Sequence, residues 1–257
     1  MNSILFDMGA TKTRLAYSVD GEIFENPEVF ETPKDYEHGL KFFIEKVKSL
    51  VGDREIKKIV GGMSRSVWNG EKFKTDLENE FQAQIFIEND AAMVGLGEAN
   101  WGAGKGFEIV AYITVSTGVG GARIVGGKID ERAIGFEPGN LIMDINTRKT
   151  LENMISGKAL QERTGKYPKE MTDQTVWDEF AKILAFGLNN IIVEWSPNVV
   201  VLGGSMITGN PSIPIDKTEK YLKEILKIFP ELPIIKKAEL GDFGGLYGGL
   251  AYLKNLN

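Results

Sequence analysis

Ser3-Ile-Leu-Phe-Asp-Met-Gly-Ala-Thr-Lys12 opens the chain with a short apolar run that ends in a carboxylate and a glycine turn. Residues 13–19 then alternate in polarity and stop at Asp20-Gly21, which is a strong hairpin signal. Half a chain later the same order returns, because the apolar run 109–115 leads through a glycine-rich turn into another strand. The repeat predicts two similar halves, each of which begins with a strand, a turn and a hairpin.

Alternating helices and strands fill the rest of both halves. Such alternation is typical of an α/β fold, and two similar halves favour a ligand cleft between them. The glycine-rich joint at residues 102–108 separates the expected domains, 1–105 and 106–257, and the last helix is free to pack back on the first domain. The pattern predicts helices over 37–51, 91–98, 176–195, 217–229 and from 246, and strands over 57–61, 85–87, 199–202 and 234–235.

Composition excludes several classes of protein. The chain has 257 residues, 42% hydrophobic and 26% charged, which is ordinary for a soluble globular protein with a sizeable core. Its net charge of -6 shows no basic excess, so we expect no nucleic-acid partner. A strand begins almost at once and no apolar stretch is long enough to span a bilayer. We therefore expect no signal peptide, no membrane contact and a cytoplasmic location.

The lack of cysteine and the single histidine limit the metal chemistry. Without Cys, disulfides and Cys-ligated zinc or iron–sulfur centres are excluded. His38 lies in a polar stretch before a predicted helix, where a surface or capping role is favoured over a catalytic one. Any metal ion would then be a hard cation held by carboxylates, phosphates and water, which indicates Mg²⁺.

The first glycine turn is a candidate phosphate site. It consists of Gly9, Ala10, Thr11 and Lys12, and it offers close backbone approach, a hydroxyl and a cation. Asp7 cannot favourably touch a phosphate oxygen, but it can reach one through hydrated Mg²⁺. When the turn is taken alone, an ordinary hairpin with a capping aspartate is the favoured interpretation.

The second glycine turn, Ser116 to Gly121, repeats the pattern. We expect its Thr117, Gly118 and Gly120 to contact phosphate as well. Because both turns follow an apolar strand and precede another, the pair favours a phosphate clamp with two sides. Neither turn is a Walker-type loop, since no Gly-Lys-Ser/Thr occurs.

A third turn, Gly203-Gly204-Ser205, follows the apolar run 199–202. It is open enough for a flat ring or a phosphate, and we assign it to ATP. A tight packing turn is the competing interpretation.

Asp90 is the candidate general base, because it ends a buried run and its carboxylate would project at a strand terminus. A carboxylate there can accept the proton of a hydroxyl that attacks a γ-phosphate. Asn89 beside it can hydrogen-bond another hydroxyl. Asn and Asp are also the favoured helix-capping residues, so capping and catalysis remain equal alternatives for this pair.

Six blocks share one order along the chain: Asp7–Lys12, Glu88–Ala92, Ser116–Gly121, Gly135–Asp144, Thr150–Leu160 and Gly241–Gly248. In this order they resemble the bacterial ROK sugar kinases of the actin/hexokinase/Hsp70 superfamily, over nearly the whole chain. The resemblance implies two similar actin-like ATPase domains with a ligand cleft between them. It also implies phosphorylation of a hexose, glucose-like or N-acetylmannosamine-like, by ATP with Mg²⁺.

The resemblance implies residue roles too. Asp90 would be the base, and carboxylates and amides would hold sugar hydroxyls, because they fix the orientation of their partners. The sugar-binding residues implied in this way are Asn89, Glu137, Asn140, Glu152 and Gly62.

Three departures from the family pattern bear on the sugar site. Asn140 stands where the family has a histidine, although it still offers hydrogen bonds to a sugar. The zinc-binding cysteines are missing, so we expect no zinc and a loop held by packing instead. Gly61 to Ser66 replaces the usual Pro-Gly segment that helps to close over the sugar.

The competing hypothesis is a non-catalytic sugar-binding or regulatory protein on the same fold. Repressors of the family carry an N-terminal helix-turn-helix, whereas here the phosphate strand starts at Ser3. Pantothenate kinases of the superfamily are disfavoured because their motif after the second turn is not found. We expect a small-molecule sugar and ATP as partners, and we leave a homodimer open.

Overall fold

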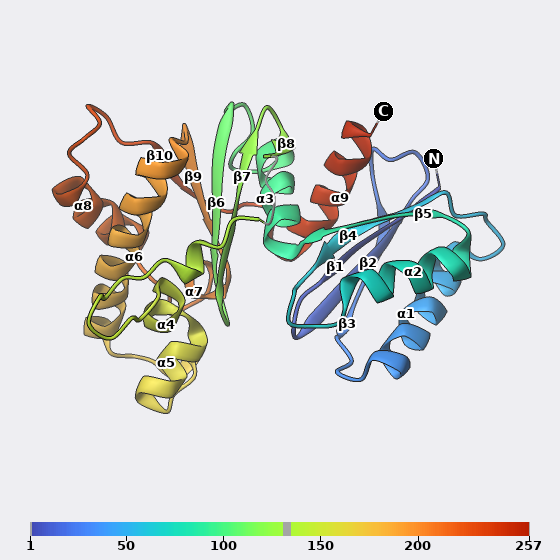
Figure 1. The fold of residues 1–257 in the computed structure, drawn as a ribbon, viewed down its shortest axis with the longest axis horizontal. Coiled ribbons are helices and arrows are strands. Elements are labelled where there is room, and N and C mark those ends of the chain that lie inside the picture. The colour runs from blue at the N-terminus through green and yellow to red at the C-terminus, as the bar shows by residue number, and fades with distance from the viewer. Residues whose placement is uncertain (1, 131–134, 257) are drawn as a thin grey trace. The chain divides into compact units, whose positions relative to one another are not determined.

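The computed structural model describes residues 2–130 and 135–256, whose strands form two five-stranded sheets (Figure 1). Contacts divide the chain into two compact units. The first unit contains the chain up to Trp101 and again from Leu240, and the second unit is Gly102–Glu239. The division lies slightly before the limit expected from the sequence, and the last helix belongs to the first unit.

The sheet of the first unit has the strand order β3-β2-β1-β4-β5. Its first three strands form an antiparallel meander, and β1, β4 and β5 run parallel. Two elements, β3 and α2, were not expected from the sequence. The elements of this unit are β1 (Ser3–Met8), β2 (Lys12–Ser18), β3 (Glu25–Glu31), α1 (Tyr36–Val51), β4 (Lys58–Met63), α2 (Gly70–Phe81), β5 (Gln84–Asn89), α3 (Asp90–Trp101), η3 (Gly241–Phe243) and α9 (Gly244–Asn255).

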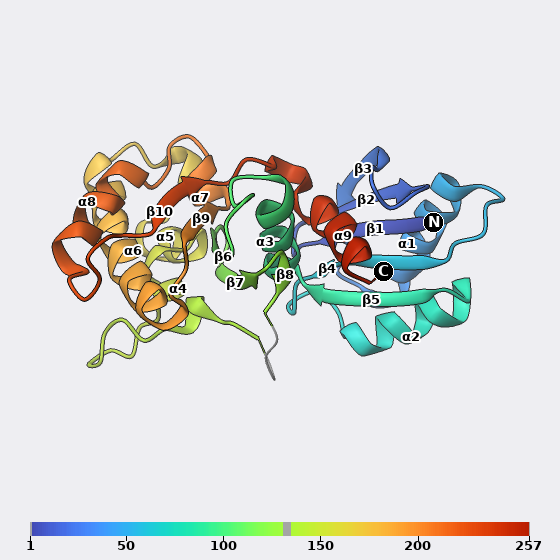
Figure 2. The same cartoon turned by 90° about the horizontal axis from the view of Figure 1, so that it is seen from above.

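Helices cover both faces of this sheet. On one face α1 and α2 pack on β1, and the Phe6 ring centroid lies 5.7 Å from that of Phe43 and 6.0 Å from that of Phe73. On the other face α9 lies over β1 and β4, beside α3 (Figure 2). Because successive residues of a strand point to opposite faces, Phe6 enters the first core whereas Asp7 faces α3 and α9.

Glycines allow α3 and α9 to pack backbone to backbone. A methyl group on Gly97 would collide with the carbonyl oxygen of Gly244, and one on Gly248 would collide with the carbonyl oxygen of Met93. The buried Glu98 adds a polar tie, since its Oε1 accepts a hydrogen bond of 2.9 Å from the Leu240 amide. These contacts fix the start of α9 against α3.

The sheet of the second unit has the order β10-β9-β6-β7-β8. It repeats the first topology, because β6, β7 and β8 are antiparallel neighbours and β6, β9 and β10 run parallel. The predicted pair of similar α/β halves is therefore confirmed. The elements are β6 (Ile109–Val115), β7 (Val119–Val125), β8 (Lys128–Ile129), η1 (Pro138–Asn140), α4 (Leu151–Ile155), α5 (Gly157–Thr164), η2 (Pro168–Glu170), α6 (Gln174–Trp195), β9 (Val199–Gly203), α7 (Ser205–Thr208), α8 (Ile215–Ile225) and β10 (Ile234–Lys237).

The long helix α6 is the centre of the second core. Its buried face includes Trp177, Phe180, Leu184 and Leu188, at helical spacing, and this face packs with inward residues of β6 and β9. None of the helices in the described part of the chain combines the length and apolar character that crossing a membrane requires.

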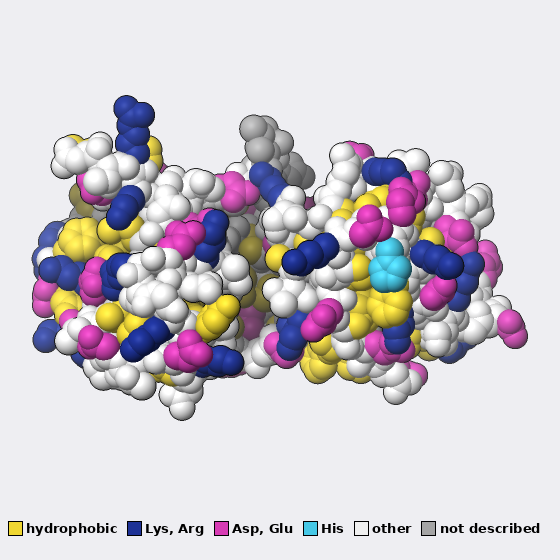
Figure 3. Space-filling model, turned by 90° about the horizontal axis from the view of Figure 1, so that it is seen from below, with side chains coloured by type: hydrophobic (Ala, Val, Ile, Leu, Met, Phe, Trp, Pro, Cys, Tyr) yellow, Lys and Arg dark blue, Asp and Glu magenta, His cyan; other side chains and the backbone are white. Residues whose placement is uncertain are grey.

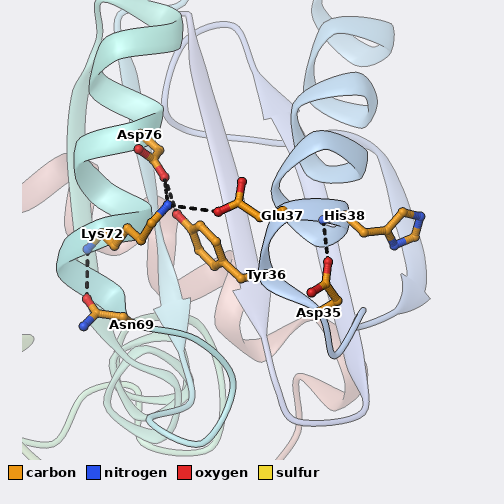
Figure 4. A network of polar contacts seen from close by, with 7 residues as sticks. All are labelled: Asp35, Tyr36, Glu37, His38, Asn69, Lys72 and Asp76. Atoms are coloured by element: carbon orange, nitrogen blue, oxygen red, sulfur yellow. Dashed lines mark hydrogen bonds and ion pairs between the residues drawn. The ribbon is translucent and has the colours of Figure 1, made fainter.

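The single histidine, His38, lies exposed on the first unit among charged side chains (Figure 3). Its backbone amide donates to the Asp35 cap of α1, and its ring points away from the polar network that joins α1 to α2 (Figure 4). In that network Lys72 Nζ lies 2.8 Å from Asp76, which also accepts from the Tyr36 hydroxyl at 2.5 Å. The histidine takes no part in it.

Candidate active site

A row of residues crosses the first sheet at the carboxyl end of β1. Asp7 is directly opposite Arg14 on β2 and directly opposite Gly62 on β4, which in turn is opposite Glu88 on β5. Residues directly opposite one another point to the same face, so the whole row faces α3 and α9. The sheet register therefore brings the polar residues of β1, β2 and β5 to one line.

Asp7 is a buried carboxylate in this row, only 7% exposed. A methyl group on Gly245 of α9 would lie 2.5 Å from its carboxyl carbon, so the helix covers it closely. Burial raises the pKa of Asp7 from 3.8 to about 7; the Arg14 guanidinium lowers it in part, and the charges of Asp90 and Asp242 raise it. The site thus concentrates negative charge around one carboxyl group.

Asn89 and Asp90 lie where β5 passes directly into α3. The Asn89 side chain accepts from the Ala92 amide at 3.1 Å, which is the geometry of a helix cap. Asp90 Oδ1 accepts from the adjacent Ala91 amide at 2.9 Å. Capping, which the sequence left open between the two residues, is performed by Asn89.

Gly62 is buried and packs against the start of α3. A methyl group there would lie 2.9 Å from the Asp90 Cα and 2.9 Å from the Met93 Cβ. The glycine therefore lets α3 begin close to β4. Through this contact Gly62 positions the backbone of Asp90.

The first turn joins β1 to β2 and exposes Ala10, Thr11 and Lys12. Gly9 closes the turn, because its amide donates to the Lys12 carbonyl at 3.0 Å. Thr32 supports it from β3's end, with its hydroxyl 2.7 Å from the Gly9 carbonyl. The turn is thus a braced hairpin whose tip is open to solvent.

The second turn joins β6 to β7 and is tied to two helices. The Gly157 amide, at the start of α5, donates to the Ser116 carbonyl at 2.7 Å. Glu152 of α4 accepts from the Val119 amide at 2.8 Å, and its Oε2 would lie 2.6 Å from a methyl group on Gly118. Thr117 is exposed at the tip, whereas Gly118 and Gly120 are half-buried.

The 3-10 turn η1 carries Glu137 and Asn140 to the same place. Both residues are exposed, and the Asn140 amide donates to the Glu137 carbonyl at 3.0 Å. Gly139 between them leaves no room for a side chain next to the Val119 carbonyl. Val119 therefore contacts both the η1 turn and Glu152. Three of the sugar-binding residues implied by the family likeness, Glu137, Asn140 and Glu152, thus lie around it.

Gly203, Gly204 and Ser205 form the turn from β9 to the short helix α7. Gly204 has a φ of 86°, and a methyl group there would lie 2.6 Å from the Thr114 hydroxyl oxygen. Only glycine suits this conformation and this space. The turn is a tight packing turn, and Ser205 is exposed at its end.

Hydrogen bonds join the two arms of the loop between η1 and α4. The Met143 amide donates to the Lys149 carbonyl at 2.8 Å, and Asp144 accepts from the Asn146 amide at 2.9 Å. Ile145 is 87% exposed. Leu141 and Met143 at the start of the loop also pack against the second core, so packing and hydrogen bonds both hold it.

The predicted site residues thus form two groups, one in each unit. Asp7, Gly62, Asn89 and Asp90 gather at the carboxyl edge of the first sheet, next to the first turn. The second group lies around Val119 and the turn after β9, and its members are Thr117, Gly118, Gly120, Glu137, Asn140, Glu152, Gly203, Gly204 and Ser205.

A model of the ROK family matches residues 4–255. The chain belongs to the ROK family. An N-acetyl-D-glucosamine kinase of Mannheimia succiniciproducens is 27% identical, over 96% of this chain and 97% of that protein. A ROK hexokinase of Thermus thermophilus has a similar structure, with a TM-score of 0.81, 25% identity and full coverage of both chains. A xylose repressor of Bacillus subtilis is 26% identical over 58% of this chain and 44% of the repressor.

These likenesses support sugar phosphorylation in general, since the N-acetyl-D-glucosamine kinase and the ROK hexokinase each match nearly the whole chain. They also show that the ROK family contains repressors. The two-domain actin-like α/β fold expected from the sequence is confirmed by the structural neighbour.

The first unit suits a magnesium ion held mainly by other ligands. Within residues 2–130 and 135–256, no three His, Cys, Asp or Glu side chains gather as a metal cage. Mg²⁺ is usually bound by one or two carboxylates together with water and phosphate oxygens. Asp7 fits that role, because a cation beside it would offset the repulsion from Asp90 and lower the pKa of Asp7.

Two polar residues of the site escaped sequence reasoning. Arg14 contacts Asp7, with 3.8 Å between Nη1 and Oδ2, and Asp242, with 3.3 Å between Nη2 and Oδ1. The hairpin register that pairs Arg14 with Asp7 was the available signal, because the turn follows Asp7 and the strand alternates after it. No sequence signal links Asp242, which lies 228 positions from Arg14.

Proposed function

We propose that this ROK protein transfers the γ-phosphoryl group of ATP to a hydroxyl of a hexose, glucose-like or N-acetylmannosamine-like, with Asp90 as general base. Asp90 accepts the hydroxyl proton, the hydroxyl oxygen forms the new bond to phosphorus, and ADP leaves. The named ROK kinases that match the whole chain support this class of reaction.

The observation that carries the proposal is the division of labour between Asn89 and Asp90. Asn89 caps α3 by accepting from the Ala92 amide, whereas Asp90 accepts from the Ala91 amide through Oδ1. Asp90 also lies close enough to Asp7 to raise the pKa of Asp7. A base and a metal-binding carboxylate are thus neighbours in one unit, as phosphoryl transfer to a hydroxyl requires.

The remaining roles follow from the family likeness and the positions of the residues. Asn89 and Gly62 in the first unit, and Glu137, Asn140 and Glu152 in the second, are assigned to the sugar. Mg²⁺, bound through water to Asp7, would neutralise charge on the phosphate oxygens. The residues assigned to ATP are Gly9, Ala10, Thr11, Lys12, Thr117, Gly118, Gly120, Gly203, Gly204 and Ser205.

The test is ADP release from ATP across a panel of hexoses, amino sugars and N-acetylated sugars, with Mg²⁺ and without zinc. We expect turnover on at least one neutral hexose. Folded protein that binds a sugar but consumes no ATP on the whole panel would refute the proposal.

That outcome would favour the second candidate, a sugar-binding regulator. One sequence feature supports it: Asn140 replaces the histidine of the family pattern in the sugar segment. The likeness to a xylose repressor shows that non-kinase members are near relatives. Sugar binding measured by calorimetry, with and without ATP, separates the two candidates.

A further inference from the structure

Arg14 occupies a central position that the proposed reaction has not yet used. It lies on β2 directly opposite Asp7, and its side chain is only 16% exposed. The charge of its guanidinium acts on Asp7, which also feels the charge of Asp90. The arginine thus borders the same small region of the first unit as the proposed base and the proposed magnesium ligand.

The partners of Arg14 do not satisfy it. Its distance of 3.8 Å from Asp7 is too long for a hydrogen bond. Asp242 is closer, at 3.3 Å, but its side chain is 72% exposed, and exposed ion pairs contribute little. The Nε atom of Arg14 is buried and has no hydrogen-bond partner. Such an unsatisfied buried donor is unusual and indicates a missing ligand or a catalytic role.

The chemistry of the site identifies an anionic ligand. The phosphoryl group passes from ADP to the hydroxyl that Asp90 deprotonates, and a cation near Asp7 would neutralise charge on the phosphate oxygens. An arginine is suited to phosphate oxygens, which it binds through a planar fork of donors. Arg14 also offsets the negative charge that Asp7 and Asp90 bring to the approaching phosphate.

We propose that Arg14 is a further catalytic residue, whose guanidinium contacts the transferred phosphoryl group and stabilises its charge in the transition state. Asp242 lies 3.3 Å from Nη2 of the same guanidinium. This inference rests on the proposed kinase function, since it needs a γ-phosphate near Asp7.

The test compares two nucleotides that differ by the γ-phosphate. Binding of ADP and of the non-hydrolysable analogue AMPPNP is measured by calorimetry for wild type and Arg14→Met, with Mg²⁺ and with EDTA. Because charge-assisted hydrogen bonds to the γ-phosphate are lost, we expect AMPPNP affinity to fall about 10- to 100-fold. ADP affinity should stay within about threefold.

A matched control is Arg54→Met, which removes another arginine of the first unit. Arg54 stacks on Tyr17, 4.3 Å from the ring centroid, and donates to the Val51 carbonyl, away from Asp7. We expect it to leave both affinities unchanged. If Arg14→Met does not fold, Arg14→Lys keeps the charge but not the fork, and it should still weaken AMPPNP more than ADP.

Each outcome decides something. Equal weakening of both nucleotides, or none, would overturn the role of Arg14 and leave the kinase proposal intact. Wild-type protein that binds neither nucleotide would overturn both. Where turnover is found, Arg14→Met should lower kcat at least about 100-fold with little change in the sugar KM.

Discussion

In the first unit Asp7 stands opposite Arg14 on one side and Gly62 on the other, whereas in the second unit Thr114 stands opposite Gly120 and Gly203. The two settings match strand for strand, because β1, β2 and β4 correspond to β6, β7 and β9. In both units a glycine near the carboxyl end of the parallel neighbour, β4 or β9, stands opposite the residue of the first strand. A charged pair is present only in the first.

The second unit brings a carboxylate to its turn by another route. Glu152 comes from α4, and one of its oxygens is occupied by the Val119 amide. Asp7, by contrast, sits within the strand itself, and its charged neighbour is Arg14, with 3.8 Å between Nη1 and Oδ2. One backbone frame thus carries two arrangements: the first unit gathers charge within its sheet, and the second fixes a carboxylate from a helix beside its turn.

The largest expected effect tests whether the chemistry belongs to the first unit. Asp90→Asn should lower kcat about 100- to 10,000-fold, because the amide cannot accept the hydroxyl proton. Sugar and nucleotide binding should remain within a few-fold of wild type, as measured by calorimetry. The control is Asp173→Asn in the second unit, which alters the cap of α6 and should leave kcat unchanged. Near-full turnover in Asp90→Asn would contradict the assignment.

A stability measurement tests the charge on the first unit's strand. The folded pKa of Asp7 is about 7, above its ordinary 3.8, so the fold loses stability as pH rises from about 4 to 7. Asp7→Asn should remove this loss. In protein stripped of divalent cations, the variant should exceed wild type at pH 8 by at most about 4 kcal/mol in the free energy of unfolding.

At pH 4 the difference between the two proteins in the free energy of unfolding should be smaller than at pH 8, because the raised pKa of Asp7 costs stability only as pH rises from about 4 to 7. A difference that does not change between pH 4 and pH 8 would show that Asp7 titrates normally. Thr114→Ser, a neutral change at the matching place in the second unit, is the pH-independent control.

A third prediction concerns the glycine contact between α3 and α9, which holds α9 over Asp7. Gly248→Ala forces a methyl group against the Met93 carbonyl, so we expect a loss of about 1–3 kcal/mol in the free energy of unfolding. Gly70→Ala is the matched control, since its methyl group meets only the end of the Met63 side chain. Equal stabilities for the two variants would mean that α9 adjusts freely.

The smallest effect concerns the fixed carboxylate of the second unit. Glu152→Ala removes the acceptor from the buried Val119 amide and should cost about 1–2 kcal/mol in urea unfolding. Glu152→Gln retains an acceptor oxygen and should recover most of this loss. If Gln is as destabilising as Ala, the charge and not the hydrogen bond holds the turn.

Most elements of the fold could be predicted from local sequence patterns. Both strand–turn–strand units were predictable because an apolar run meets a glycine turn in each. β3 was missed, because Glu25-Asn-Pro-Glu-Val-Phe-Glu31 has few apolar residues and contains a proline, as edge strands often do. α2 was missed because only Phe73 and Leu77 of its twelve residues are buried, so its apolar stripe is narrow.

The site was predictable only where chemistry is local. Asp90 and Asn89 could be named, but the sequence did not say which of them caps α3. The contacts of Arg14 with Asp242, and of Glu152 with the second turn, depend on segments brought together by tertiary packing. Glu137 and Glu152 were found through the family likeness alone, because a surface carboxylate carries no signal of its own.

The return of the chain to the first unit at Leu240 has a consequence for synthesis on the ribosome. The second unit is complete once residues 102–239 have emerged, but the first still lacks the helix that covers Asp7 and packs on α3. Until residues 240–255 have been made, Asp7 and the adjoining side of α3 therefore lack the helix that covers them. A fragment ending at residue 239 would expose this part of the first unit.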